Sequence, residues 1–137
     1  MIALTRRYRF PAAHVLASPE LDDASNQAIF GACANPRGHG HNYGVDVTVT
    51  GPVGEDGRIV DPDLLDAIFE EEVAGPYSHH MLNDVAPFGA LVPTAENIAR
   101  AIHDRLAVPI AVRTGARLAR VLIDETRRNS VTCGSLR

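Results

Sequence analysis

The chain has 137 residues and a formal net charge of −4; 45% of its residues are hydrophobic and 22% are charged. This length and composition are typical of a soluble globular protein, so we expect a single domain over residues 1–137. The sequence contains no basic tail or basic block, which removes the electrostatic basis for a nucleic-acid partner.

The first predicted element is a strand from Ile2 to about Leu16. Along this stretch apolar and polar residues alternate, and one parity ends at His14. Pro11 interrupts the pattern and predicts a bulge or an edge position, because proline cannot donate a hydrogen bond to a neighbouring strand. Residues 18–38 form a long connection in which we expect a short helix or turn.

A second strand is predicted over residues 41–51, where four apolar residues share one face: Tyr43, Val45, Val47 and Val49. A helix then begins at Asp61-Pro62, with a capping side chain followed by a proline at the first helical position. Its apolar stripe consists of Leu64, Leu65, Ile68 and Phe69. We expect Gly75-Pro76 to end this helix.

A second helix is predicted from a cap at Thr94 to a stop before Pro109. Two further strands follow, Arg117–Glu125 and Val131–Cys133. The order strand, strand, helix, helix, strand, strand predicts an α+β fold in which both helices pack on one face of an antiparallel sheet.

Three histidines are expected to converge at one end of this sheet. Because side chains alternate along a strand, His39 and His41 emerge on the same face, roughly 7 Å apart at Cα. His14 lies near the end of the preceding strand, so pairing of the two strands brings three imidazoles together. Three neutral imidazoles are a known catalytic zinc set; the alternative is a polar turn beside a histidine of the core.

Cys33 precedes the histidine pair and has two possible roles. It could be a fourth ligand that closes a structural zinc site, or it could stand off the metal as a thiolate base or nucleophile. Spacing alone leaves both open. We expect Cys133, the other cysteine, to be a small strand residue and His103 to be an exposed helix residue.

The N-terminal residues MIALTRRYRF place arginines where a signal peptide would have its apolar run, and no stretch approaches a membrane span. With two cysteines in unlike contexts, reduced thiols are the simplest expectation. We therefore expect a cytoplasmic protein with no membrane partner.

Five motifs occur in a distinctive order: FPAAH around His14, FGACANPRGHGHNY from Phe30, SHHMLN from Ser78, PTAENIA from Pro93, and DET around Glu125. In this order they resemble the 6-pyruvoyl-tetrahydropterin synthase family, which includes the 6-carboxy-tetrahydropterin synthases. The resemblance implies a tunnelling fold, with a four-stranded antiparallel sheet and two helices packed on one face. It also implies a homo-oligomer, commonly a hexamer built as a dimer of trimers, with active sites at subunit interfaces.

The resemblance further implies roles for individual residues. The zinc ligands would be His14, His39 and His41. Cys33 would be the catalytic base and His79 a second acid/base. Glu125 would anchor the pterin ring, which the segment containing Thr94 and Glu96 would help to hold.

The implied activity is that of a zinc-dependent lyase that eliminates triphosphate from 7,8-dihydroneopterin triphosphate. The six-residue step from Cys33 to His39 favours a 6-pyruvoyl product. The alternatives are a 6-carboxy-5,6,7,8-tetrahydropterin synthase of queuosine (7-deazaguanine) biosynthesis and a non-catalytic zinc protein that binds pterin. A third family branch forms a hydroxymethyl product and usually carries glutamate in place of the cysteine, so Cys33 argues against it.

The sequence departs from the family pattern at Ser78, where aspartate usually precedes the catalytic histidine. Serine can bond to an imidazole but supplies no negative charge, which puts the relay through His79 in question. Asp84, or a residue of another subunit, could compensate. The spacing to Leu82-Asn83 favours His79 over His80 as the acid/base, and His80 is expected to be a solvated neighbour.

Overall fold

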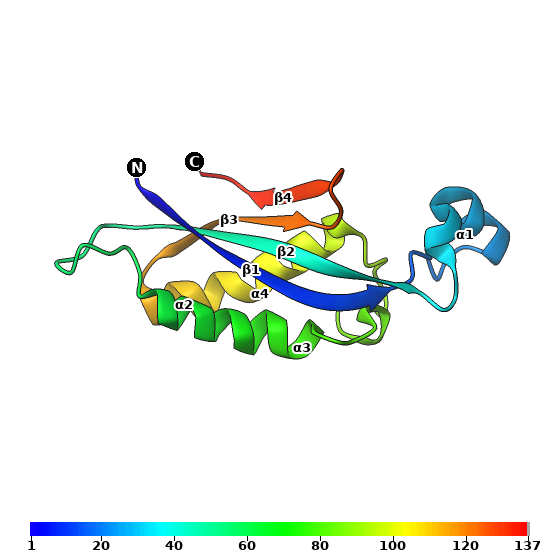
Figure 1. The fold of residues 1–137 in the computed structure, drawn as a ribbon, viewed down its shortest axis with the longest axis horizontal. Coiled ribbons are helices and arrows are strands. Elements are labelled where there is room, and N and C mark those ends of the chain that lie inside the picture. Colours follow the sequence, from blue (N-terminus) through cyan, green and yellow to red (C-terminus); the bar gives the residue numbers. More distant parts are fainter. Residues whose placement is uncertain (137) are drawn as a thin grey trace.

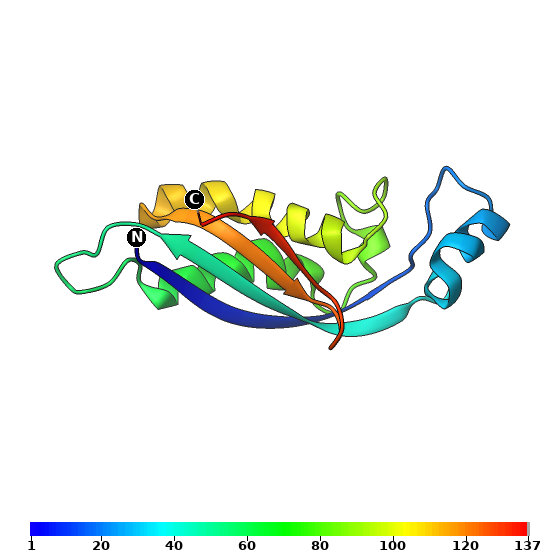
Figure 2. The same ribbon diagram turned by 90° about the horizontal axis from the view of Figure 1, so that it is seen from above.

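The computed structural model describes residues 1–136, whose four strands form one antiparallel sheet in the order β1-β2-β3-β4. The strands are β1 (Ala3–His14), β2 (His39–Thr50), β3 (Arg117–Asp124) and β4 (Ser130–Gly134). Figures 1 and 2 show the long helices side by side against one face of this sheet. The predicted α+β arrangement is confirmed.

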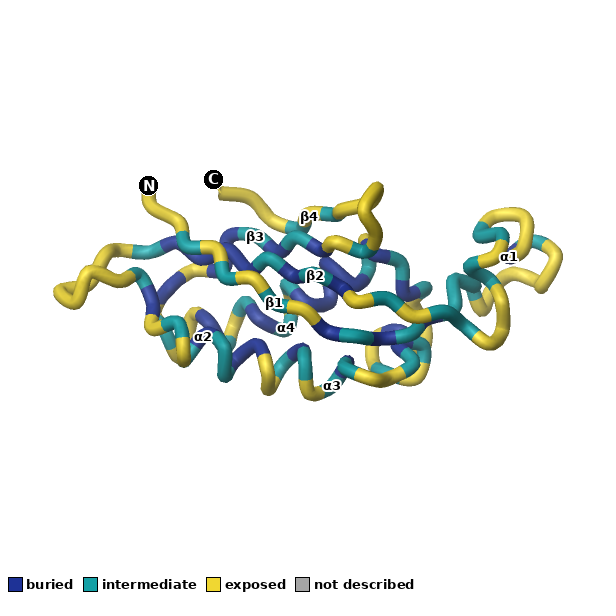
Figure 3. The backbone as a smooth tube through the Cα atoms, viewed as in Figure 1, coloured by how far each residue is buried: buried dark blue, intermediate teal, exposed yellow. Residues whose placement is uncertain are grey.

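The core lies between the helices and the sheet face made by alternate strand residues (Figure 3). Its strand residues with no exposed surface are Tyr43, Val45, Val47, Val49, Val121 and Ile123. β1 is an edge strand, and its pairing with β2 continues without a break through Pro11, which lies opposite Asn42. Of the two predictions for Pro11, the edge position is therefore correct and the bulge is not.

The first long helical segment does not end at Gly75-Pro76, so that prediction is wrong. α2 (Pro62–Phe69) continues as a π-helical turn (Glu70–Ala74) and then as α3 (Gly75–Tyr77). In the wider turn the N–H of Gly75 donates to the carbonyl of Glu70, five residues back. Complete burial of Val73 and Tyr77 keeps the backbone helical on both sides of the proline.

The second long helix also continues past its predicted end. α4 (Ala95–Thr114) begins at the expected Thr94 cap but passes through Pro109 and ends at Gly115, whose φ of 75° forms a left-handed cap. An interior proline costs about 3 kcal/mol. Burying Ile110 completely recovers about 1.5–3 kcal/mol, and the Gly115 cap adds to that.

The connection between β1 and β2 contains the expected short helix, α1 (Asp23–Phe30), followed by a 3-10 turn at Gly31–Ala34. Asp22 caps α1 by accepting a hydrogen bond from the N–H of Ser25. Figures 1 and 2 show this arm extending beyond the end of the sheet. Within residues 1–136, no helix combines the length and apolar character needed to cross a membrane.

Candidate metal centre and catalytic site

Strand pairing brings the three predicted histidines together. His14 lies directly opposite His39 in the register of β1 and β2, and Ala12 lies opposite His41. The distances between the ring centroids are 4.5 Å for His14–His39, 5.0 Å for His14–His41 and 4.9 Å for His39–His41. One ring nitrogen from each histidine lies within 4.8 Å of the other two. The predicted convergence is confirmed.

The ring of His14 is held in one orientation by its surroundings. The ring is completely buried, and its Nδ1 lies 2.8 Å from the carbonyl oxygen of Pro93. Because a carbonyl can only accept a hydrogen bond, Nδ1 carries the proton and Nε2 keeps its lone pair. That Nε2 faces the Nε2 of His39 at 2.9 Å. The backbone of Pro93 therefore sets the tautomer that a metal ligand needs.

The site fits a metal ion that prefers nitrogen ligands. The Nε2 of His41 is buried and has no hydrogen-bond partner within residues 1–136. Such an orphaned nitrogen is costly unless something binds its lone pair. Imidazole nitrogens suit zinc, copper, iron and nickel, and three neutral histidines are a familiar zinc set.

Electrostatics favour the neutral, ligating form of these rings. The pKa of His14 is lowered to about 4, chiefly by burial and to a smaller extent by the charges of His39 and His41, while the hydrogen bond to Pro93 opposes this shift. Burial also lowers the pKa of His41, which the negative charge of Glu125 partly offsets. Neither ring therefore needs to lose a proton near neutral pH before it binds a metal.

Glu125 follows β3 directly and lies close enough to the histidines to influence them. Its charge acts on His41 and, after burial, is a further cause of the raised pKa of Tyr43. It lines a cavity of about 580 Å³ together with Arg9, Asn42, Gly44, Asp124, Thr126 and Arg127. A carboxylate at the wall of an open cavity is available to a ligand. None of the three histidines lines this cavity, and Glu125 is linked to them by the charge that acts on His41.

The residues at the start of α4 border the histidine site on another side. The hydroxyl of Thr94 accepts a hydrogen bond from the N–H of Asn97 at 3.3 Å, so it serves as the helix cap. Glu96 is exposed in the first turn. Because Thr94 follows Pro93, this helix start lies beside His14.

Cys33 lies in the 3-10 turn at the base of the arm and is half-buried. Its carbonyl accepts a hydrogen bond from the N–H of Leu16 at 2.8 Å, which ties the arm to the chain just after His14. Its sulfur is not a member of the metal-ligating group found in residues 1–136. The geometry therefore does not favour a structural site closed by Cys33.

His79 lies beside the edge of β1, where its N–H donates to the carbonyl of Pro11 at 2.7 Å. Its φ of 61° is unusual for a residue other than glycine. His79 is exposed, and it lines a cavity of about 620 Å³ together with the partly buried His41. Within residues 1–136, no hydrogen bond joins the Ser78 hydroxyl to His79.

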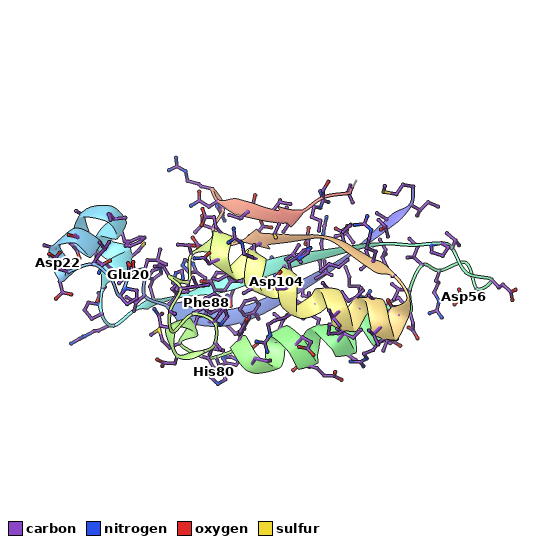
Figure 4. The ribbon with its side chains drawn as sticks, turned by 180° about the vertical axis from the view of Figure 1, so that it is seen from behind. Glu20, Asp22, Asp56, His80, Phe88 and Asp104 are labelled. Carbon is purple, nitrogen blue, oxygen red and sulfur yellow. The ribbon has the colours of Figure 1, made fainter. Side chains whose placement is uncertain are left out.

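His80 borders the same cavity as His79, but its ring is bonded to the backbone of its own loop. Its Nδ1 lies 2.8 Å from the carbonyl oxygen of Ser78, and the residue is exposed. Figure 4 shows His80 on the outer side of the loop that follows α3. This position agrees with the expectation of a solvated neighbour.

Two contributors to the site were not predicted from the sequence. One is the Pro93 carbonyl, a backbone group that no residue pattern reveals. The other is Asn83, whose side-chain oxygen accepts from the N–H of Val15 at 2.8 Å while its amide donates to the carbonyl of Val15 at 2.9 Å. The sequence did contain a signal for Asn83, because it is the last residue of the SHHMLN motif. In the structure Asn83 fixes the backbone of Val15, next to His14.

Comparison with known proteins gives a consistent result. The profile described as 6-pyruvoyl tetrahydropterin synthase matches residues 3–135. The 6-pyruvoyl tetrahydrobiopterin synthase of Homo sapiens is 39% identical over 132 residues, which cover 93% of this chain and 88% of the human protein. The structure of the Caenorhabditis elegans 6-pyruvoyl tetrahydropterin synthase superimposes with a TM-score of 0.88 at 34% identity, covering 98% of this chain and 95% of that one.

A relative with a different product matches less of the chain. The 6-carboxy-5,6,7,8-tetrahydropterin synthase of Bacillus subtilis is 37% identical over 81 residues, which cover 56% of this chain and 51% of that protein.

Proposed function

This chain belongs to the 6-pyruvoyl tetrahydropterin synthase family, whose members are lyases, and from that premise we propose that it acts on 7,8-dihydroneopterin triphosphate with a zinc ion. The product would be a 6-pyruvoyl-tetrahydropterin, formed as triphosphate leaves. The observation that carries this proposal is the convergence of three ligating nitrogens, from His14, His39 and His41, beside the carboxylate of Glu125.

Each functional side chain has a distinct task in this proposal. A zinc ion held by the three histidines would supply Lewis acidity toward the hydroxyl groups of the substrate side chain. The carboxylate of Glu125 accepts two N–H bonds from the aminopyrimidinone of the pterin, a two-point contact that a hydroxyl cannot reproduce. Thr94 and Glu96 border the ring at the start of α4.

The proton transfers belong to Cys33 and His79. The Cys33 thiolate removes a proton from the substrate side chain, and the His79 imidazole exchanges a proton with the same side chain as triphosphate departs. The cavity that His79 lines together with His41 supports this role, because it connects the acid/base group with one of the proposed metal ligands. We place the enzyme in the cytoplasm, where the thiol would stay reduced.

We also propose that the active unit is a homo-oligomer, a hexamer built as a dimer of trimers. The outer edge of β1 is bonded to the loop at residues 79–81 through Pro11 and Ala13, but from Ala3 to Phe10 it pairs with no other strand within residues 1–136, and such an edge pairs readily with a strand of another chain. The protruding arm carries exposed apolar side chains, with Ile29 63% and Leu21 40% exposed. Both features support contact with further copies at the site.

A 6-carboxy product is the alternative for the same active site. The human 6-pyruvoyl relative aligns with 93% of the chain, whereas the Bacillus subtilis 6-carboxy relative aligns with 56%. That difference, together with the spacing from Cys33 to His39, favours the pyruvoyl product. A non-catalytic pterin-binding protein is favoured only by Ser78, which cannot supply the negative charge of the usual aspartate to His79.

One assay tests these possibilities together. The purified protein, loaded with zinc, is incubated with 7,8-dihydroneopterin triphosphate while triphosphate release and product mass are measured. We expect release and a pyruvoyl product, with release lost in Cys33→Ala. Equal release by Cys33→Ala would contradict the base role, a carboxy product would favour the alternative branch, and pterin binding without release would favour the non-catalytic protein.

A further inference from the structure

Pro76 leaves a backbone carbonyl without its usual donor in the helical segment that precedes His79, the proposed acid/base residue. Proline has no N–H, so it cannot donate to the carbonyl of Glu72, four residues earlier. The missing donor comes from another helix: the Nε–H of Arg105 on α4 donates to the Glu72 carbonyl at 2.7 Å. A side chain 33 residues away in the sequence thus satisfies a group that the proline leaves open.

Arg105 makes a second contact on the other side of the proline. Its guanidinium carbon lies 5.3 Å from the centroid of the Tyr77 ring, a cation–π arrangement. Tyr77 has no exposed surface, and its ring packs against Phe10 and Phe88, with centroid distances of 6.0 and 5.9 Å. Arg105 therefore contacts the chain on both sides of Pro76.

The segment that follows includes the strained backbone of His79. Its φ of 61° places it in the left-handed region, which a residue other than glycine keeps only when the surroundings impose it. The N–H of Ser78 donates to the carbonyl of Ala74 at 2.9 Å, that of His79 to Pro11 at 2.7 Å, and that of His80 to Tyr77 at 3.2 Å. Two of these acceptors, Ala74 and Tyr77, lie within the helical segment that Arg105 contacts.

We infer that Arg105 is a positioning residue for His79, because it holds the proline-containing helix end from which His79 takes its backbone conformation. The expected change in kcat rests on the proposed function, because it presupposes that His79 takes part in the reaction. The structural role of Arg105 does not, because its contacts exist whatever reaction the protein catalyses. Replacing Arg105 would loosen residues 78–80 and misplace the His79 imidazole. Because Arg105 takes no part in the pterin contact assigned to Glu125, kcat would fall while KM stays the same.

Arg113 provides a matched control on the same helix. It also joins α4 to the π-helical turn, through an ion pair of 2.6 Å with the carboxylate of Glu71. This ion pair is exposed and contacts a side chain, whereas Arg105 satisfies a backbone carbonyl. Exposed ion pairs contribute little to stability, so Arg113→Gln removes an equivalent charge without releasing the helix end.

The test combines amide hydrogen exchange with steady-state kinetics on the zinc-loaded protein. For Arg105→Gln we expect the amides of Ser78, His79 and His80 to exchange about tenfold faster, and kcat for triphosphate release to fall about tenfold or more with KM unchanged. Arg113→Gln should match the wild type in both measurements. Unchanged exchange in Arg105→Gln, or an equal rise across α4 and the sheet, would overturn the positioning role.

Arg105→Lys separates the hydrogen bond from the charge. Lysine keeps the positive charge but lacks an Nε–H at the position that reaches the Glu72 carbonyl. Arg105→Lys should therefore show the same faster exchange and lower kcat as Arg105→Gln. Wild-type exchange and kcat in Arg105→Lys would overturn the inference. If the wild-type protein releases no triphosphate, the proposed function fails by itself. The exchange measurement would then still decide whether Arg105 holds residues 78–80.

Discussion

The Nδ1 atom of His14 lies 2.8 Å from the carbonyl oxygen of Pro93, a residue 79 positions further along the chain. This contact joins the end of edge strand β1 to the start of α4 and directs the Nε2 of His14 toward His39. The same helix carries Arg105, which reaches the segment before His79. One helix therefore orients a candidate metal ligand at its start and supports the proposed acid/base residue from its middle.

Removal of one metal ligand should strongly weaken metal binding. We expect His39→Ala to lower zinc affinity more than about hundredfold, because even partners that only orient a ligand contribute 10–100-fold. The measurement is zinc content after dialysis, together with competition against a chromogenic chelator. His80→Ala is the control, since His80 is exposed and does not belong to the group of ligating nitrogens formed by His14, His39 and His41. Full zinc retention by His39→Ala would refute the assigned ligand set.

The metal-free protein should lose stability as the pH falls between about 6.5 and 4. Burial lowers the pKa of His14 from 6.5 to about 4 in the folded protein. Between these values the unfolded chain binds a proton that the folded chain does not, so acid favours unfolding. The loss is of the order of 3 kcal/mol at most.

Urea denaturation of chelator-treated protein at several pH values measures this dependence. His14→Gln removes the titrating group, so its stability should change less over the same pH interval. An identical pH dependence in the variant would show that other groups cause the loss.

Asp66 should stabilise the contact between β1 and α2. Its carboxylate accepts hydrogen bonds from Arg6 Nε at 2.8 Å, Arg6 Nη2 at 2.7 Å and the Tyr8 hydroxyl at 2.8 Å. The hydrogen bond from Arg6 is the main cause of the lowered pKa of Asp66. Because the pair is part-exposed, we expect Asp66→Asn to lower the free energy of unfolding by only about 1 kcal/mol.

This change is measured by urea denaturation at neutral pH, with Asp104→Asn on the exposed side of α4 as the control. The contribution of Asp66 requires its ionised form, so it should be present above pH 3.8 and be lost as the pH falls through the lowered folded-state value. Equal stability of wild type and Asp66→Asn at neutral pH would contradict the prediction.

Glu125→Gln should weaken pterin binding without releasing the metal. The amide keeps the shape but loses the charge that strengthens a two-point contact, so we expect KM to rise about tenfold or more. Zinc content should remain at the wild-type level. Glu55→Gln is the control, because it makes the same chemical change at an exposed position that does not line the cavity of Glu125. A wild-type KM in Glu125→Gln would show that Glu125 does not bind the pterin ring.

Ser78→Asp should increase activity if His79 lacks a negatively charged partner. A carboxylate beside an imidazole raises its basicity, and we expect kcat to rise about tenfold, which is below the usual range for general acid–base catalysis. The measurement is kcat for triphosphate release by the zinc-loaded variant. Ser78→Asn, which adds the same volume without charge, is the control. A fall in kcat in the aspartate variant would indicate that Ser78 is already the functional residue.

Two wrong predictions concern helix ends, and both have the same origin. Pro76 and Pro109 are reliable stop signals for an isolated helix because each removes a backbone donor. In this fold, a wider turn and Arg105 accommodate Pro76, while complete burial of Ile110 retains the turn after Pro109. Local rules failed where contacts distant in sequence outweighed one lost hydrogen bond.

The sequence by itself determined which residues share a face. Side-chain alternation follows from the backbone geometry of a strand, so His39, His41 and Tyr43 had to emerge together wherever that strand lay. Only the tertiary structure decided the tautomer of His14, the place of Glu125 beside His41 and the support of His79 by Arg105. Those relationships join segments that are far apart in the chain, and they depend on how α4 packs against the sheet and the neighbouring helix rather than on any local periodicity.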